Sequence, residues 1–102
     1  MKFLLSLYPG AGTGHEEFLA MAGRAGELIG GHELADPSLA IVVRLRDGVA
    51  TVTEGPYPPD AEHVARQYLV DCESRDRAVE LAGLLRGRVE VRPLMEPAGL
   101  EM

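Results

Sequence analysis

Two side chains with chemical potential, Glu54 and Tyr57, flank a Gly-Pro dipeptide in the middle of the chain. A carboxylate and a phenol at this spacing suit the wall of a ligand cleft. We predict that Glu54 and Tyr57 bind a ligand, with Arg44 and Tyr68 nearby. The alternative is a structural corner, because the glycine permits an unusual dihedral angle and the proline fixes the next one. In that case Tyr57 packs across a sheet, and both roles are compatible.

The other reactive side chains point to simpler roles. Cys72 ends an apolar segment and, as the single cysteine, forms no internal disulfide, so we predict a small buried hydrophobe. His32 follows Gly31 at an expected helix end, where the helix dipole favours an imidazolium, and His63 lies in a proline-rich connection. The chain has no His-x-x-x-His, Cys-x-x-Cys or EF-hand spacing, so we predict neither a metal nor a cofactor.

Composition narrows the class of protein. The chain has 102 residues, of which 46% are hydrophobic and 25% charged, as expected for one globular domain. The net charge of −6 and the scattered arginines argue against a nucleic-acid partner, which needs clustered cations. The apolar stretch within residues 1–10 is too short for a signal peptide, and no window approaches the length of a membrane span. We therefore expect a cytoplasmic protein with no membrane contact.

The positions of these side chains depend on the elements that carry them. Thr13 and Glu16 form a capping box, so a helix is expected from about Gly14, and its apolar periodicity continues to Ile29. Gly30-Gly31 should end that helix, and Asp47-Gly48 is a strong hairpin signal. Ser74 should cap a second helix. The pattern predicts strands over residues 2–8, 39–46, 49–54, 66–72 and 88–93, a first helix over about 14–29, a loop over 32–38 and a second helix over 75–86.

The predicted order is β-α-β-β-β-α-β, which indicates a ferredoxin-like α+β fold with an antiparallel sheet and two helices on one face. The strands over 2–8 and 39–46 are apolar at nearly every position, so the other face of the sheet should also be covered. A chain of this size has no further element to cover it. We therefore expect a twofold homodimer whose sheets pack face to face.

A set of short motifs resembles the YCII-related (DGPF-domain) family. These motifs are Gly30-Gly31 with Leu34 and Pro37, Val43-Arg44 with Asp47-Gly48, Thr53-Glu54-Gly55-Pro56-Tyr57, Tyr68-Leu69-Val70-Asp71, and Val89-Glu90-Val91-Arg92-Pro93 with Met95. Glu54 and Tyr57 stand where that family usually has Asp and Phe. The resemblance implies a dimeric α+β barrel, with residues 1–95 as the domain and 96–102 as a C-terminal tail.

The resemblance also implies an active centre. The wider family often has a His in the first helix and an Asp before the second strand, and the matching residues are His15 and Asp36. A carboxylate beside an imidazole fixes its tautomer and raises its basicity, which suits proton transfer near neutral pH. The alternative is that His15 lies in an exposed helical turn and that Asp36 forms an Asp-Pro turn.

Two functions remain as hypotheses. The first is a dimeric small-molecule-binding domain with cofactor-free acid–base activity, such as proton transfer, isomerisation or a lyase reaction. The second is a non-catalytic accessory or regulatory module, because bacterial proteins of the resembled family accompany alternative sigma factors. A cofactor-free oxygenase with the same barrel architecture is a third hypothesis that depends on analogy of fold alone.

Overall fold

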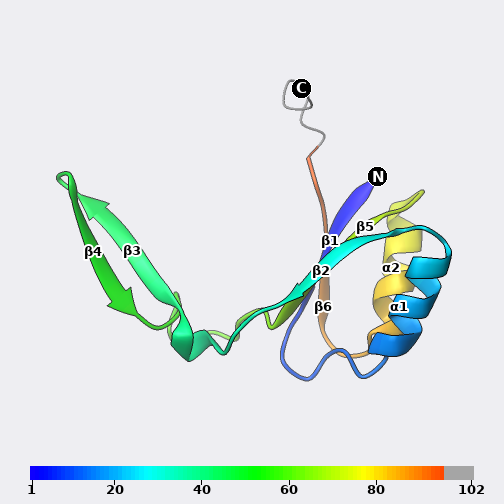
Figure 1. The fold of residues 1–102 in the computed structure, drawn as a ribbon, viewed down its shortest axis with the longest axis horizontal. Helices are drawn as coiled ribbons and strands as arrows, with labels where there is room; N and C mark the ends of the chain where they lie inside the picture. The colour runs from blue at the N-terminus through cyan, green and yellow to red at the C-terminus, as the bar shows by residue number, and fades with distance from the viewer. Residues whose placement is uncertain (96–102) are drawn as a thin grey trace.

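The computed structural model describes residues 1–95, which form a body and a separate hairpin (Figure 1). We call the hairpin, residues 41–54, the arm. The fold is α+β with two helices and antiparallel sheets. The elements are β1 (Lys2–Leu7), α1 (His15–Arg24), β2 (Leu28–Glu33), the 3-10 turn η1 (Pro37–Leu39), β3 (Ile41–Arg46), β4 (Val49–Glu54), β5 (Arg66–Asp71), α2 (Arg75–Leu84) and β6 (Val89–Pro93).

The body is a four-stranded sheet in the order β2-β5-β1-β6, with every neighbouring pair antiparallel. Both helices cover the same face of this sheet (Figure 1). Alternate residues of β1 and β5 point into the core that forms there. This core contains Phe3, Leu5, Leu7, Phe18, Ala22, Tyr68, Val70, Cys72, Ala78, Leu81, Ala82 and Leu85. The arrangement is consistent with the ferredoxin-like α+β fold expected from the sequence.

Strand β2 corrects the prediction of a helix that continues to Ile29. Helix α1 ends at Arg24, and Gly26 then adopts a φ of +71° that turns the chain. Residues Leu28–Glu33 pair antiparallel with β5 instead. The long-range pairing with β5 therefore overrides the local helical periodicity. The chain consequently has one strand more than the predicted order, and Gly30 and Gly31 lie within a strand.

The start of α1 also differs from the expectation. Gly14 is the N-cap residue, and no side chain caps the helix, so the Thr13–Glu16 capping box does not form. A Cβ atom at Gly14 would lie 1.7 Å from the carbonyl oxygen of Leu84, so the helix start is packed against the end of α2. The predicted cap of α2 is confirmed, because Ser74 Oγ accepts a hydrogen bond of 3.1 Å from the backbone N–H of Arg77.

The arm is the predicted Asp47-Gly48 hairpin, with β3 and β4 paired antiparallel in register Val43↔Val52. Asp47 and Gly48 have φ values of 52° and 77°, as a type I′ turn requires. The strand begins at Ile41 and not at residue 39, because Pro37–Leu39 form η1. The backbone N–H of Gly55 donates to the carbonyl of Ala40 at 2.7 Å, which closes the base of the arm.

The arm forms a two-stranded sheet of its own, so the prediction that residues 39–46 supply apolar residues to the main sheet is wrong. The open face of the body sheet carries Leu4 and Leu69, both partly exposed, among polar side chains. Within residues 1–95, no helix is long and apolar enough to cross a bilayer. The predicted C-terminal tail, 96–102, lies outside the described residues.

Candidate functional site

The predicted site residues fall into two groups. His15 and Tyr68 lie together in the body, at the start of α1 and in the middle of β5. Asp36 and Tyr57 lie together beside the base of the arm, where they line the same groove. Arg44 belongs to the second group through Tyr57, because its guanidinium carbon lies 5.4 Å from the centre of the Tyr57 ring.

The body group is built on Tyr68, whose side chain is buried with only 3% of its surface exposed. Its hydroxyl forms a short hydrogen bond with Nδ1 of His15, and Nε2 of the same ring lies 3.3 Å away. The Phe18 ring packs against Tyr68 with 4.7 Å between ring centres. A phenol donates to a neutral imidazole nitrogen and accepts from a protonated one. The pair can therefore pass a proton between the two side chains.

Two neighbours from β2 and β5 position Tyr68. Gly31 lies directly opposite it, and a Cβ atom at Gly31 would lie 2.3 Å from Cδ1 of the Tyr68 ring. Glycine is therefore needed for the ring to lie across the edge strand. Arg66 Nη1 donates to the Tyr68 hydroxyl at 3.4 Å, and Arg66 Nη2 lies 3.2 Å from a carboxylate oxygen of Glu33.

Sequence reasoning missed the roles of Arg66 and Glu33. The two residues are cross-strand partners in the β2–β5 pair. An opposite-charge pair at such positions stabilises a sheet. The opposite charges of Glu33 and Arg66 could therefore have indicated their pairing, but only if residues 28–33 had been recognised as a strand.

The predicted hydrogen bond between His15 and Asp36 does not form within the described part of this chain. The imidazole of His15 contacts Tyr68, whereas Asp36 Oδ1 accepts from the backbone N–H of Ser38 at 2.9 Å. This hydrogen bond caps η1, and it lowers the pKa of the Asp36 carboxyl below its ordinary value. Asp36 thus forms the Asp-Pro turn that was the alternative to a catalytic role.

The arm-base groove has a volume of about 400 Å³. Most of its lining is apolar and comes from the segment before the arm, from β3 and from the connection that follows β4. The lining includes Leu34, Leu39, Ile41, Val42, Pro56 and Val64. Asp36, Tyr57 and His63 are the polar or amphipathic groups that reach it. An apolar hollow with a few polar groups is the usual form of a small-molecule site.

The polar lining residues differ in how firmly they are held. His63 Nε2 forms a 2.7 Å hydrogen bond with the carbonyl of Pro58, which fixes the ring at one end of the groove. Tyr57 is 67% exposed, and the contact described for its ring is the one with the Arg44 guanidinium. Glu54, the remaining predicted ligand-binding residue, lies opposite Ile41 at the end of β4 and is exposed. It does not contribute to the lining of the arm-base groove.

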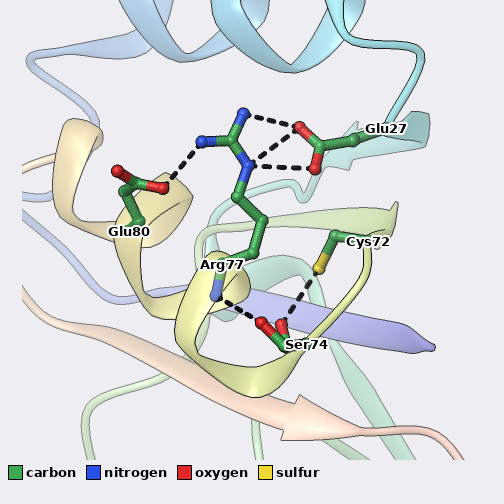
Figure 2. Close-up of polar contacts among 5 residues, drawn as sticks. All are labelled: Glu27, Cys72, Ser74, Arg77 and Glu80. Carbon is green, nitrogen blue, oxygen red and sulfur yellow. Dashed lines mark hydrogen bonds and ion pairs between the residues drawn. The ribbon is translucent and has the colours of Figure 1, made fainter.

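A second polar cluster, in the body, is structural (Figure 2). Arg77 of α2 donates to both carboxylate oxygens of Glu27, with Nε–Oε2 at 2.9 Å and Nη2–Oε1 at 2.8 Å, and to Glu80 at 2.7 Å. These carboxylates raise the pKa of the Arg77 guanidinium above its ordinary value. Glu27 directly precedes β2, so this clamp fastens the edge strand to α2. The charges of the three side chains pair with one another.

Cys72 lies beside this clamp and is buried, as predicted from its sequence position. Its thiol donates to the carbonyl of Ser74, with 3.4 Å between sulfur and oxygen (Figure 2). Burial raises the pKa of the Cys72 thiol, which opposes the thiolate that a nucleophile needs. Within residues 1–95, no group of three or more His, Cys, Asp and Glu side chains is arranged to hold a metal ion.

A scan against protein-family models and a search of curated proteins each found no match to this chain. The functional proposal therefore rests on the geometry of the two groups of residues. Membership of the YCII-related family is itself part of that proposal.

Proposed function

We propose that this chain is a small-molecule-binding domain that acts as a homodimer and holds its ligand in the arm-base groove. The observation that carries the proposal is the groove itself, about 400 Å³ in volume, with an apolar lining and the convergent polar groups Asp36, Tyr57 and His63. Pockets of a few hundred Å³ with this division of lining suit small organic ligands.

The charge of the lining favours one class of ligand. Asp36 reaches the groove, and its lowered pKa keeps the carboxylate ionised at neutral pH. The adjoining hollow, which shares Asp36 and His63, also includes Glu62. The proposed ligand is therefore a compact apolar molecule that carries an amine or another hydrogen-bond donor.

Benzylamine and benzoate test this preference, because they share a ring and differ in charge. NMR titration of the labelled protein should show that benzylamine binds more tightly and shifts the amide signals of residues 34–42. Asp36→Asn should abolish the preference, while Glu16→Gln, an acid on α1 outside the groove, should preserve it. Equal binding of both probes, or shifts confined to other residues, would refute the proposed ligand site.

Acid–base activity is a separate part of the proposal, because the His15–Tyr68 pair lies in the body and does not line the arm-base groove. The hydrogen bond between imidazole and phenol supports proton transfer without a cofactor. Small carbonyl compounds with an acidic C–H bond are suitable probes, with deuterium uptake from D2O followed by NMR. The protein should accelerate exchange of at least one probe, and His15→Gln and Tyr68→Phe should each reduce the rate toward that of buffer. Exchange that survives both substitutions would remove the pair from the proposal.

The open face of the body sheet supports the homodimer, because Leu4 and Leu69 are only partly covered there by the described residues. We propose a twofold pair with the two sheets face to face, as in the α+β barrel of the YCII-related family, which the sequence motifs resemble. A light-scattering mass twice that of one chain is the expected result.

The exposed arm favours a second candidate function. Its apolar residues Ile41, Val43, Leu45 and Val52 are all more than half exposed, as in a surface that another protein covers. A non-catalytic accessory module of an alternative sigma factor system would use this surface for its regulatory partner. A monomeric chain in solution that binds neither amine nor carboxylate probe would favour this candidate over the ligand-binding dimer.

A further inference from the structure

The arm has one apolar face and one polar face. The cross-strand register puts Ile41, Val43, Leu45, Ala50 and Val52 on one side of the ribbon, with the carboxylate of Glu54 opposite Ile41 at the base of the arm. Arg44, Arg46, Thr51 and Thr53 lie on the other side with Val42 and Val49. The large side chains of the apolar face are 58–74% exposed, so nothing in the described part of the chain covers them.

A free ribbon of two strands is marginally stable in water, and a third strand or a packing surface normally supports it. Residues 1–95 give the arm neither of these, because β3 pairs only with β4 among the described strands. The molecule is accordingly extended, with principal dimensions of 48 × 37 × 17 Å and a radius of gyration of 16.2 Å. A compact chain of this length would have a radius of about 13 Å. The arm therefore needs a surface that another molecule supplies.

The position of the arm identifies a second copy of the chain as that molecule. The arm lies on the side of the body sheet opposite to the helices (Figure 1). The open sheet face with Leu4 and Leu69 is turned to that same side. A twofold contact on this side of the sheet would cover the apolar face of the arm and the open sheet face in each copy.

The area is sufficient for such a contact. Full burial of a Val, Leu or Ile side chain removes roughly 60–120 Å² of apolar surface from water. The four large apolar side chains of each arm are 58–74% exposed, so in a twofold pair, counted with an equal area of the surfaces that they cover, they bury roughly 600–1,200 Å². This range includes the area of about 1,000 Å² that a specific interface requires.

We infer that the apolar face of the arm packs on a second copy of this chain, and that this contact closes the arm-base groove. Leu39 and Ile41 line the groove, yet they are 73% and 61% exposed in the single chain. The partner therefore supplies the missing wall, and the groove is complete only in the dimer. The inference rests on the homodimer of the proposed function and assigns its interface to the arm.

A matched pair of substitutions in β4 tests the inference. Val52 and Thr53 are neighbours on opposite faces of the arm, and both are exposed. Val52→Asp introduces two charges into a twofold interface and should raise the dissociation constant of the dimer at least about tenfold. Thr53→Asp adds the same charge to the polar face and should change that constant by less than about twofold. Light scattering over a dilution series measures both, and circular dichroism verifies that each variant is folded.

Hydrogen exchange of the unsubstituted chain provides a measurement that needs no variant. The amides of β3 and β4 should be protected at high protein concentration and exchange faster on dilution, whereas those of β1 and β5 should not change. Benzylamine should also bind the dimer more tightly than the Val52→Asp monomer.

The outcomes separate the two claims. A wild-type chain that is monomeric at every concentration overturns both the homodimer and the arm interface. A dimer that tolerates Val52→Asp as well as Thr53→Asp leaves the homodimer standing and overturns the arm interface. Arm exchange that is independent of concentration overturns the arm interface too, and equal benzylamine affinity in dimer and monomer overturns closure of the groove.

Discussion

The body and the arm contain strands with the same apolar alternation, but their apolar side chains differ in burial. In β1, Phe3, Leu5 and Leu7 alternate along the strand and are at most 2% exposed. In β3, Ile41, Val43 and Leu45 alternate in the same way and are at least 58% exposed. The period of two specifies which side of a strand is apolar. It does not specify whether the covering surface comes from the same chain or from another one.

The comparison is tested most strongly by the same substitution in each region. Leu5→Ala removes a fully buried side chain and should destabilise the body by about 2–5 kcal/mol. Leu45→Ala, at the exposed tip of the arm, should change the free energy of unfolding by less than about 0.5 kcal/mol. Urea denaturation followed by circular dichroism, at a dilution where the chain is monomeric, measures both. Similar losses in the two variants would show that the arm is covered within its own chain.

Two adjacent glycines of β2 give the next largest contrast. Gly31→Ala places a Cβ atom against the Tyr68 ring and should cost about 1–3 kcal/mol through overpacking. Gly30 has open space at the corresponding position, so Gly30→Ala should lie between no change and a gain of about 1 kcal/mol. Denaturation gives the stabilities, and the NMR signals of His15 report whether its contact with Tyr68 persists. Equal effects would mean that the ring does not lie over Gly31.

The clamp on β2 should show a smaller contrast between its two carboxylates. Glu27 is 14% exposed and accepts three hydrogen bonds from Arg77, whereas Glu80 is 68% exposed and accepts one. Glu27→Gln should therefore lower the melting temperature clearly more than Glu80→Gln does. Differential scanning calorimetry measures both variants. A reversed order would indicate that the edge strand is held by its ladder with β5 alone.

The smallest expected effect concerns pH at the junction of body and arm. The backbone N–H of Ser38 lowers the pKa of Asp36 in the folded chain, so the ionised carboxylate stabilises η1. This stabilisation is complete above the unfolded pKa of about 4 and is lost as the pH falls through the lower folded value. The NMR shift of the Ser38 amide should follow that titration, and Asp36→Ala should abolish it. A midpoint at or above about 4 would contradict the cap.

Two local signals in the sequence were reliable, whereas the local capping box of Thr13 and Glu16 and the long-range pairing of β2 were not predicted correctly. Asp47-Gly48 and Ser74 act on residues within three positions, and the structure confirms the hairpin and the cap that they predict. Strand β2 was not predicted because its strand conformation depends on pairing with β5, which follows it by many residues in the sequence. Its residues Leu28 and Ile29 also continue the helical spacing of α1.

The candidate site divides in the same manner. The sequence assigned Tyr57 to a ligand site and Asp36 to a catalytic pair with His15, whereas in the structure Asp36 and Tyr57 line one groove. It also selected His15 and Tyr68, but it assigned His15 to Asp36 and gave Tyr68 a separate role. No pattern along the chain indicates that the start of α1 lies beside the middle of β5. That contact depends on the packing of Phe18 under the helix and on the space above Gly31.

The hydrogen bond between Gly55 and Ala40 has a consequence for how this chain can vary. This hydrogen bond holds the two ends of segment 41–54 together at the base of the arm. The segment is therefore a closed loop whose length the body does not determine. Doubling the length of such a loop costs only about 0.6 kcal/mol in closure entropy. Related chains can therefore exchange one ribbon for another, and with it one binding partner for another, while the body continues to fold in the same way.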